Sequence, residues 1–195
     1  MLSNLKEEEK LDPRVKRTRS LILRSFESLL AEKNFESISV QDVTARAQIN
    51  RATFYAHFED KYKLLDHWIS RMFMQELDKR MRDVGHYTPD NLRNLILGVC
   101  EFLSQLHVEC AQPHQQFESL VETQIKQQIH DLLSHWLEES KTNVSTEIPA
   151  TVATWAIYGL ASQYSHSKER PSLEQFVDEA LPLVAINLEQ FAQPA

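Results

Sequence analysis

Apolar residues recur at helical spacing along most of this 195-residue chain. Ile22, Phe26, Leu29 and Leu30, for example, fall on one stripe of a helix expected over residues 15–33. The sustained alternation of polar with β-branched or aromatic residues that is typical of strands is nearly absent. The sequence therefore predicts an all-α fold.

Capping signals and helix breakers divide this pattern into about nine helices. Ser39 begins a helix of about two turns, with a capping box that is completed by Asp42. Asn50 can cap the short helix that follows. Pro182 should kink or break the last helix. After residue 33 we expect helices over about 39–47, 51–58, 60–82, 88–109, 115–140, 147–166 and 172–192.

Composition excludes several functional classes. The three glycines, Gly85, Gly98 and Gly159, are too far apart for a GxGxxG or Walker-type phosphate loop. Kinases, P-loop NTPases and Rossmann dehydrogenases are therefore excluded. Two cysteines, Cys100 and Cys110, are too few for a disulfide scaffold or a zinc finger, and we expect both as reduced thiols.

Hydropathy predicts a cytoplasmic protein with no membrane partner. The N-terminal residues MLSNLKEEEK lack the apolar core of a signal peptide. The longest apolar stretch, residues 95–106, is too short to span a bilayer and contains Glu101.

The net charge of −7 hides a split along the chain. Residues 10–63 hold 11 Lys and Arg against 7 Asp and Glu, whereas residues 64–195 hold 9 against 18. A basic head followed by an acidic body favours an anionic partner for the head alone.

The basic head contains a helix-turn-helix pattern: an amphipathic helix and then two short helices joined by a tight turn at Gln48 and Ile49. The helix that begins at Arg51 carries polar side chains suited to base edges and phosphates. Phe54 and Phe58, four residues apart, are expected to face inward together. On this pattern alone, a polar face that is merely solvated stays an alternative.

Residues 39–65, SVQDVTARAQINRATFYAHFEDKYKLL, resemble the DNA-binding domain of the TetR family of bacterial repressors. Including the upstream helix, the resemblance covers residues 14–74, about a third of the chain. Gln48 and Ala52 stand where many members have glycine. The matching residues are Thr53, Phe54, Tyr55, His57, Phe58 and Lys61, followed by Leu64 and Leu65.

The resemblance implies a domain order and a set of DNA contacts. Residues 1–13 would form a flexible arm, residues 14–60 (to about 74 with the start of the fourth helix) the DNA-binding domain, and residues 61–195 a ligand-binding and dimerisation domain. The implied contacts are Arg51, Ala52 and Tyr55 to bases in the major groove; Ser39, Thr53, His57 and Lys61 to phosphates; Arg14, Lys16 and Arg17 to the backbone or minor groove; and Gln41 and Asn50 beside them.

The resemblance also implies a homodimer and a small-molecule effector. A pocket would be lined by Trp68, Met72, Phe102, Leu106, Phe117, Trp136, Trp155 and Tyr158, although each of these residue types is also typical of plain core. The dimer would use the last two helices through Trp155, Gly159, Val177, Leu181, Val184, Leu188 and Phe191, with an intramolecular core as the alternative.

No metal site, cofactor or catalytic residue is predicted. His107, Cys110 and His114 have a suggestive spacing, but Pro113 interrupts the helix that would bring them together. Taken together, the resemblance implies a homodimeric, ligand-relieved repressor of a palindromic double-stranded operator. The alternatives are a transcriptional activator, a DNA-tethered structural factor, or a small-molecule-binding or catalytic helical protein with a vestigial helix-turn-helix.

Overall fold

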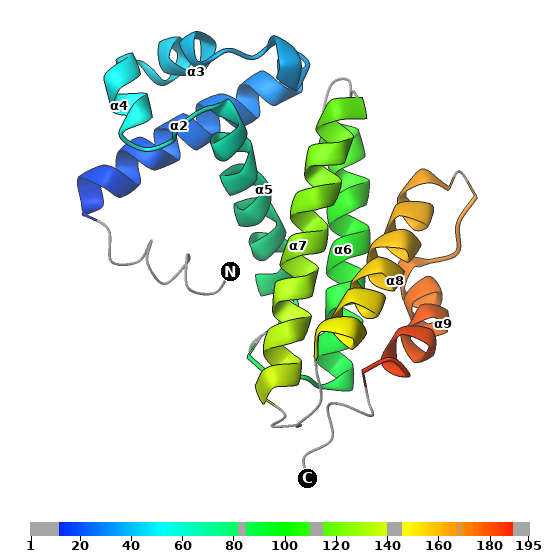
Figure 1. Cartoon of the computed structure of the whole chain (residues 1–195). Helices are drawn as coiled ribbons and strands as arrows, with labels where there is room; N and C mark the ends of the chain where they lie inside the picture. The colour runs from blue at the N-terminus through cyan, green and yellow to red at the C-terminus, as the bar shows by residue number, and fades with distance from the viewer. Residues whose placement is uncertain (1–11, 82–84, 110–114, 140–145, 168, 189–195) are drawn as a thin grey trace. The chain divides into compact units, whose positions relative to one another are not determined.

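The computed structural model describes residues 12–81, 85–109, 115–139, 146–167 and 169–188. Within these ranges the chain forms eight α-helices, one 3-10 helix and no strand, so the all-α prediction is confirmed (Figure 1). The elements are α2 (Pro13–Glu32), η1 (Phe35–Ser37), α3 (Val40–Ala47), α4 (Arg51–Tyr55), α5 (Lys61–Asp78), α6 (Pro89–Glu109), α7 (Gln115–Glu139), α8 (Glu147–His166) and α9 (Leu173–Ala185).

Three helices end earlier than the sequence predicts. α4 stops at Tyr55 rather than at residue 58, because the N–H groups of His57 and Phe58 both donate to the Phe54 carbonyl in a tightened last turn. α5 stops at Asp78 rather than near residue 82. α9 continues three residues past Pro182 and ends at Ala185, whereas the predicted end at residue 192 lies outside the described residues.

The chain divides into two compact units. Unit 1 contains residues 1–70 and 108–122, and α3 packs against α2 within it (Figure 1). Its core is built from side chains with no exposed surface, such as Ile22, Phe26, Val43, Phe54 and Leu64. Burying this apolar area is what stabilises three helices that are each short or strongly basic.

Unit 2 contains residues 71–107 and 123–195. Ile96 on α6, Ile129 on α7 and Ile157 on α8 have no exposed surface, so each of these helices has a buried side. α9 packs on α8, and Arg93 on α6 forms an ion pair of 2.9 Å with Asp178 on α9. No local sequence pattern predicts that the start of α7 belongs to the same unit as the N-terminal helices.

Unit 2 also buries a carboxylate. Glu76 is 3% exposed and accepts a hydrogen bond of 2.6 Å from Lys79 Nζ. The guanidinium of Arg80 contacts both Glu76 and Glu101. Because a buried charge is costly unless it is paired, this cluster fixes the end of α5 against α6.

Candidate nucleic-acid interface

A reciprocal cap fixes the start of α3. The Ser39 N–H donates to Asp42 Oδ2 at 2.8 Å, and the Asp42 N–H donates to Ser39 Oγ at 3.2 Å, so the predicted capping box is confirmed. The Ser39 hydroxyl also donates to Asp42 Oδ2 at 2.6 Å, and Lys33 Nζ lies 3.0 Å from the same oxygen. These hydrogen bonds hold the pKa of the Asp42 carboxyl well below its usual range.

Gln48 makes the turn between α3 and α4. Its φ of 54° and ψ of 44° lie in the left-handed region that favours glycine. The Ile49 N–H then donates to the Thr44 carbonyl at 3.0 Å and closes the turn. Gln48 therefore adopts the conformation expected of the glycine that it replaces, at a cost in backbone energy.

α4 separates a buried aromatic side from an exposed face. Phe54 is 0% and Phe58 5% exposed, as the sequence predicts, whereas 52% of Tyr55 is exposed. Arg51 and Ala52 are exposed as well. The three residues predicted to approach bases are thus brought together on one solvent-facing turn, which we call the α4 face.

The predicted phosphate contacts are less free than the sequence suggests. The hydroxyl of Thr53 donates to Asn50 Oδ1 at 2.9 Å, just as the hydroxyl of Ser39 is used within its cap. His57 is half-buried, and burial, with a smaller contribution from nearby Arg19, lowers its pKa. Lys61 Nζ donates to three backbone carbonyls. The phosphate roles of these residues stay predictions.

The basic residues ahead of the motif lie on a helix. Arg14, Lys16 and Arg17 are exposed in the first two turns of α2, which Asp12 caps by accepting from the Arg14 N–H at 2.7 Å. Gln41 is exposed at the start of α3. The three cations are therefore presented by a rigid element rather than by an extended arm, while residues 1–11 lie outside the described residues.

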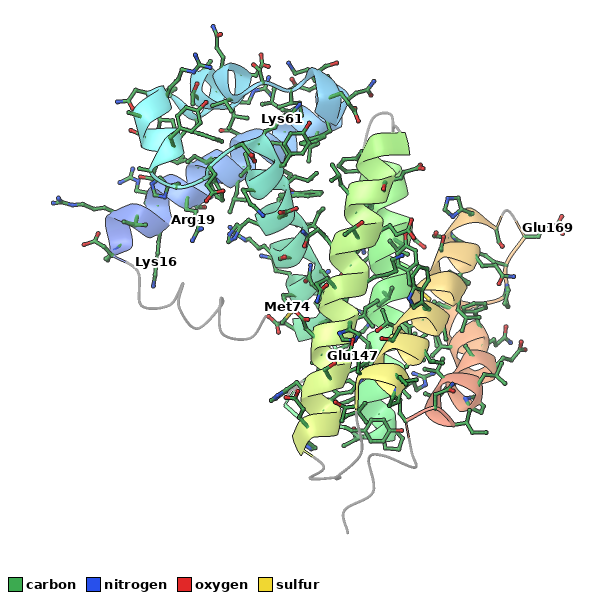
Figure 2. The ribbon with its side chains drawn as sticks, in the orientation of Figure 1. Lys16, Arg19, Lys61, Met74, Glu147 and Glu169 are labelled. Carbon is green, nitrogen blue, oxygen red and sulfur yellow. The ribbon has the colours of Figure 1, made fainter. Side chains whose placement is uncertain are left out.

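Two arginines that the sequence analysis missed hold the motif to α2. Arg46 on α3 donates to the Glu32 carboxylate at 2.5 and 2.6 Å and to Ser28 Oγ at 2.7 Å. The guanidinium of Arg19 on α2 (labelled in Figure 2) lies 5.1 Å from the ring centroid of Phe58. Residues so far apart in sequence give no local signal of pairing.

The residues of the predicted ligand pocket are divided between the two units. Trp68 and Phe117 belong to unit 1, whereas the other six residues belong to unit 2. Four of the aromatics are at most 4% exposed and pack against other rings: Trp68 on Phe26, Phe102 on Phe73, Phe117 on Phe35, and Trp136 on Tyr87. Leu106 is also buried, and Met72 and Tyr158 are half-buried. Most of the set is buried among neighbouring side chains within each unit, and its role as a ligand pocket stays a prediction.

Unit 2 instead carries a surface groove of about 400 Å³ between α7 and α8. Lys126 Nζ lies 3.6 Å from the ring centroid of Trp155, and His130 Nε2 lies 3.6 Å from Glu147 Oε1. From the predicted pocket, Trp155 alone is among the lining residues, which are Thr123, Lys126, Gln127, His130, Glu147, Thr151, Thr154 and Trp155.

The residues of the predicted dimer surface divide into exposed and buried ones, and the dimer itself stays a prediction. On α8, Trp155 is 59% exposed and Gly159 is exposed, and Ile148 and Val152 continue the same stripe. We call these four residues the α8 stripe. By contrast, Val177 and Val184 on α9 and Leu188 just after it have no exposed surface, so they form core within the chain, and Leu181 is half-buried. The exposed apolar residues near the C-terminus are Leu183 and Ile186, and Phe191 lies outside the described residues.

No group of three or more histidine, cysteine, aspartate or glutamate side chains in the described part of the chain could hold a metal ion. The side chains of His107, Cys110 and His114 are outside that part. The described helices also include none long and apolar enough to cross a bilayer.

Comparison with known proteins finds a family model and a relative that match the motif. Residues 22–67 match the model of bacterial regulatory proteins of the tetR family. An uncharacterised helix-turn-helix-type transcriptional regulator of Bacillus subtilis, YxbF, is 39% identical over 72 residues, which are 36% of this chain and 19% of that protein. The matched stretch is therefore less than a fifth of that relative's length.

Solved structures share the fold of almost the whole chain. A TetR-family regulator from Streptomyces coelicolor superposes with a TM-score of 0.66 at 12% identity and covers 91% of this chain and 98% of its own. Salmonella enterica GusR superposes with a TM-score of 0.57 at 20% identity, and the match covers 93% of this chain and 99% of GusR. FadR from Bacillus subtilis, solved in complex with stearoyl-CoA, superposes with a TM-score of 0.55 at 15% identity. The match covers 85% of this chain and 96% of FadR.

Proposed function

Because residues 22–67 match the model of the tetR family of bacterial regulatory proteins, we propose that the chain is a member of that family and a sequence-specific transcriptional regulator that binds double-stranded DNA as a homodimer. In this proposal it is a binding protein rather than an enzyme, and it acts on bacterial DNA in the cytoplasm. The observation that carries the proposal is the α4 face, where Arg51, Ala52 and Tyr55 are exposed together above a buried aromatic anchor.

The chemistry of the α4 face suits a major groove. An arginine can donate two hydrogen bonds to the O6 and N7 atoms of guanine, and the methyl group of an alanine can contact the methyl group of thymine. The exposed Tyr55 hydroxyl can donate to or accept from a base edge or a phosphate. Exposed Arg14, Lys16 and Arg17 add the positive charge that phosphates attract.

A single short helix offers too few base contacts for useful affinity, so we propose a two-fold dimer on a palindromic site. The α8 stripe supports this, because its three large apolar side chains are between 45% and 70% exposed in the single chain. A Cβ atom built on Gly159 meets nothing within 4 Å, so a partner helix has room to approach. Two recognition helices would then enter major grooves about 34–36 Å apart.

We further propose that a small molecule releases the DNA, which makes the chain a ligand-relieved repressor. The groove between α7 and α8 offers a place for a polar effector, with an ammonium and hydroxyls on its walls, next to the indole ring that Trp155 contributes to the α8 stripe. Coupling between the two sites must be reciprocal, so DNA should weaken effector binding by the same factor. A compound that stabilises the protein but leaves DNA affinity unchanged would contradict this part.

The test is selection of duplexes from a random pool by the purified full chain. We expect an inverted repeat to be enriched and to bind with at least about a thousandfold preference over a shuffled duplex at the same salt concentration. Sedimentation of the complex should give two chains per duplex. If no sequence is enriched, or if binding is insensitive to salt, the rival reading of a small-molecule-binding protein with a vestigial motif is favoured.

A further inference from the structure

Four charged side chains join the end of α2 to α3, which packs against it (Figure 1). Arg46 on α3 donates to the two carboxylate oxygens of Glu32 at 2.5 and 2.6 Å, and to Ser28 Oγ at 2.7 Å. One turn earlier on α3, Asp42 Oδ2 lies 3.0 Å from Lys33 Nζ. Each helix end thus supplies one anion and one cation. We call these two ion pairs the α2–α3 clasp.

The clasp is partly exposed, but its geometry is well defined. The side chains of Arg46 and Glu32 are 34% and 54% exposed. A single exposed ion pair contributes little to stability, whereas a bidentate arginine–carboxylate pair that belongs to a network has a fixed orientation. The hydrogen bond from Arg46 holds the pKa of the Glu32 carboxyl below its usual value, so the carboxylate stays charged. The clasp should therefore contribute direction more than stability.

Apolar packing alone does not fix how α3 is rotated about its own axis. The buried side of α3 is formed by Val43, which is 0% exposed, and Ala47, which is 7% exposed. Both side chains are small, and the hydrophobic effect has no direction. Asp42 and Arg46 lie one helical turn apart, and each has its own partner at the end of α2. Two such contacts along one helix set its rotation.

A short hydrogen-bonded connection carries this rotation on to the α4 face. Gln48 makes the turn, and the Ile49 N–H donates back to the Thr44 carbonyl at 3.0 Å. On the far side of the turn, Asn50 Oδ1 accepts from the Thr53 N–H at 2.7 Å and begins α4. Because both ends of the connection are held, α4 moves with α3 when α3 rotates.

We propose that Arg46 and Glu32 are positioning residues for DNA recognition: Arg46 acts through Glu32, and their ion pair sets the rotation of α3 and thereby the α4 face. This inference rests on the proposed DNA-binding function. It gives an acidic residue a part in the recognition of a polyanion, which its charge alone would not suggest.

The experiment is a double-mutant cycle of Arg46→Gln, Glu32→Gln and the double variant in the full chain. Glu27→Gln is the matched control, because Glu27 is exposed on the same helix and the variant loses the same charge. Affinity for the selected and the shuffled duplex is measured over a range of salt, at a temperature where each variant is folded. The ratio of the two affinities cancels the general effect of charge on DNA binding.

We expect Glu32→Gln and Arg46→Gln each to lower the preference for the selected duplex by roughly three- to tenfold, and the double variant to lose no more than the worse single variant. Glu27→Gln should keep the wild-type preference. The melting temperature of each variant should stay within about 4 °C of the wild-type value, because the lost ion pair is partly exposed.

A phosphate contact by Arg46 would give a different result. Arg46→Gln would then weaken both duplexes equally, with a slope of log K against log salt that is shallower by about 0.9, and Glu32→Gln would leave the preference unchanged. That result would overturn the proposal. A lower melting temperature with wild-type preference in both single variants would mean a purely structural ion pair and would overturn it equally.

Arg46→Lys keeps the proposal falsifiable if Arg46→Gln does not fold. Lysine keeps the charge and can hold a phosphate as a point charge, but it lacks the planar fork that matches a carboxylate. The preference should therefore fall while the salt dependence stays the same, and wild-type preference in this variant would count against the proposal. Failure of the proposed function itself is distinguishable, because the wild-type chain would then select no duplex at all.

Discussion

Asn50 Oδ1 accepts two hydrogen bonds from Thr53, one of 2.7 Å from the backbone N–H and one of 2.9 Å from the hydroxyl. This pair begins α4, which has five residues and is far too short to be stable by itself. The α4 face therefore depends on a side-chain cap at one end and on the buried Phe54 beneath it.

Asn50→Ala should lower the free energy of unfolding by about 1 kcal/mol, because the N–H of Thr53 loses its acceptor. Asn50→Asp keeps an acceptor oxygen in the same place. Its free energy of unfolding should therefore lie within a few tenths of a kcal/mol of the wild-type value. Urea denaturation of both variants checks this. Equal losses in the two would show that the cap contributes nothing.

The protein should be more stable with glycine than with another residue at position 48. Its φ of 54° costs roughly 1–2 kcal/mol for a residue with a Cβ atom, and the entropy that glycine gains in the unfolded chain offsets part of this. We expect Gln48→Gly to exceed Gln48→Ala in free energy of unfolding by about 1 kcal/mol. Because both variants lose the glutamine side chain, their difference isolates the backbone, and an Ala variant as stable as the Gly variant would contradict the conformation described.

His57 should make both stability and DNA binding depend on pH, in opposite directions. Its pKa in the folded chain is lowered from 6.5 by burial, so the unfolded chain takes up the proton first as pH falls. This contribution to stability is fully present above pH 6.5 and is lost as pH falls through that value toward the folded pKa. A bound phosphate would instead favour the protonated form, so DNA affinity should rise as pH falls from 8 to 6.

His57→Gln should weaken both dependences, whereas the exposed His166→Gln, which lies in unit 2, should change neither. Thermal melts and fluorescence anisotropy from pH 5.5 to 8 are the measurements. A variant at residue 57 that keeps the full pH dependence of DNA affinity would remove His57 from the phosphate contacts.

Local chemistry made much of unit 1 predictable. Ser39 and Asp42 signalled the start of α3, and the spacing of Phe54 and Phe58 signalled the inward side of α4, because caps and periodicity are properties of neighbouring residues. The partners of Arg46 and Lys61 could not be predicted in this way. Glu32 lies 14 residues from Arg46, and the Phe35 carbonyl lies 26 residues from Lys61, so those contacts exist only once the helices have packed.

Unit 2 was predictable in its helices but less so in its surfaces. Apolar spacing reveals that a helix has a buried side, but it cannot tell whether another helix of the same chain or a partner covers it. Val184 and Leu188 were therefore assigned to a dimer surface although they are fully buried within the chain. Trp155 and Gly159 stood out for their residue types, and both are exposed.

The exposure of Gly159 gives a sharp test of the dimer. A Cβ atom at this position would meet nothing within 4 Å in the single chain, and Gly159 is exposed, so we expect Gly159→Trp to fold and to fail only where a partner helix would approach. Leu183→Glu with Ile186→Glu, at side chains 68% and 70% exposed, should also fold. We expect both variants to be helical monomers by circular dichroism and sedimentation, with weakened operator binding.

Leu188→Glu is the contrasting variant. Leu188 is fully buried, so a charge there should unfold the C-terminal helices rather than separate two folded chains. If the wild type sediments as a monomer at micromolar concentration, or if both surface variants stay dimeric, the proposed interface is wrong.

The central claim is that Arg51 and Tyr55 on the α4 face read base sequence. The most direct measurement is the affinity of Arg51→Ala and Tyr55→Ala for the selected duplex and for a shuffled duplex, at one fixed salt concentration. A lost base contact should cost about 1–3 kcal/mol per half-site on the selected duplex and leave the shuffled duplex almost unchanged. Equal losses on the two duplexes, or no loss on either, would contradict the assignment of this face to sequence recognition.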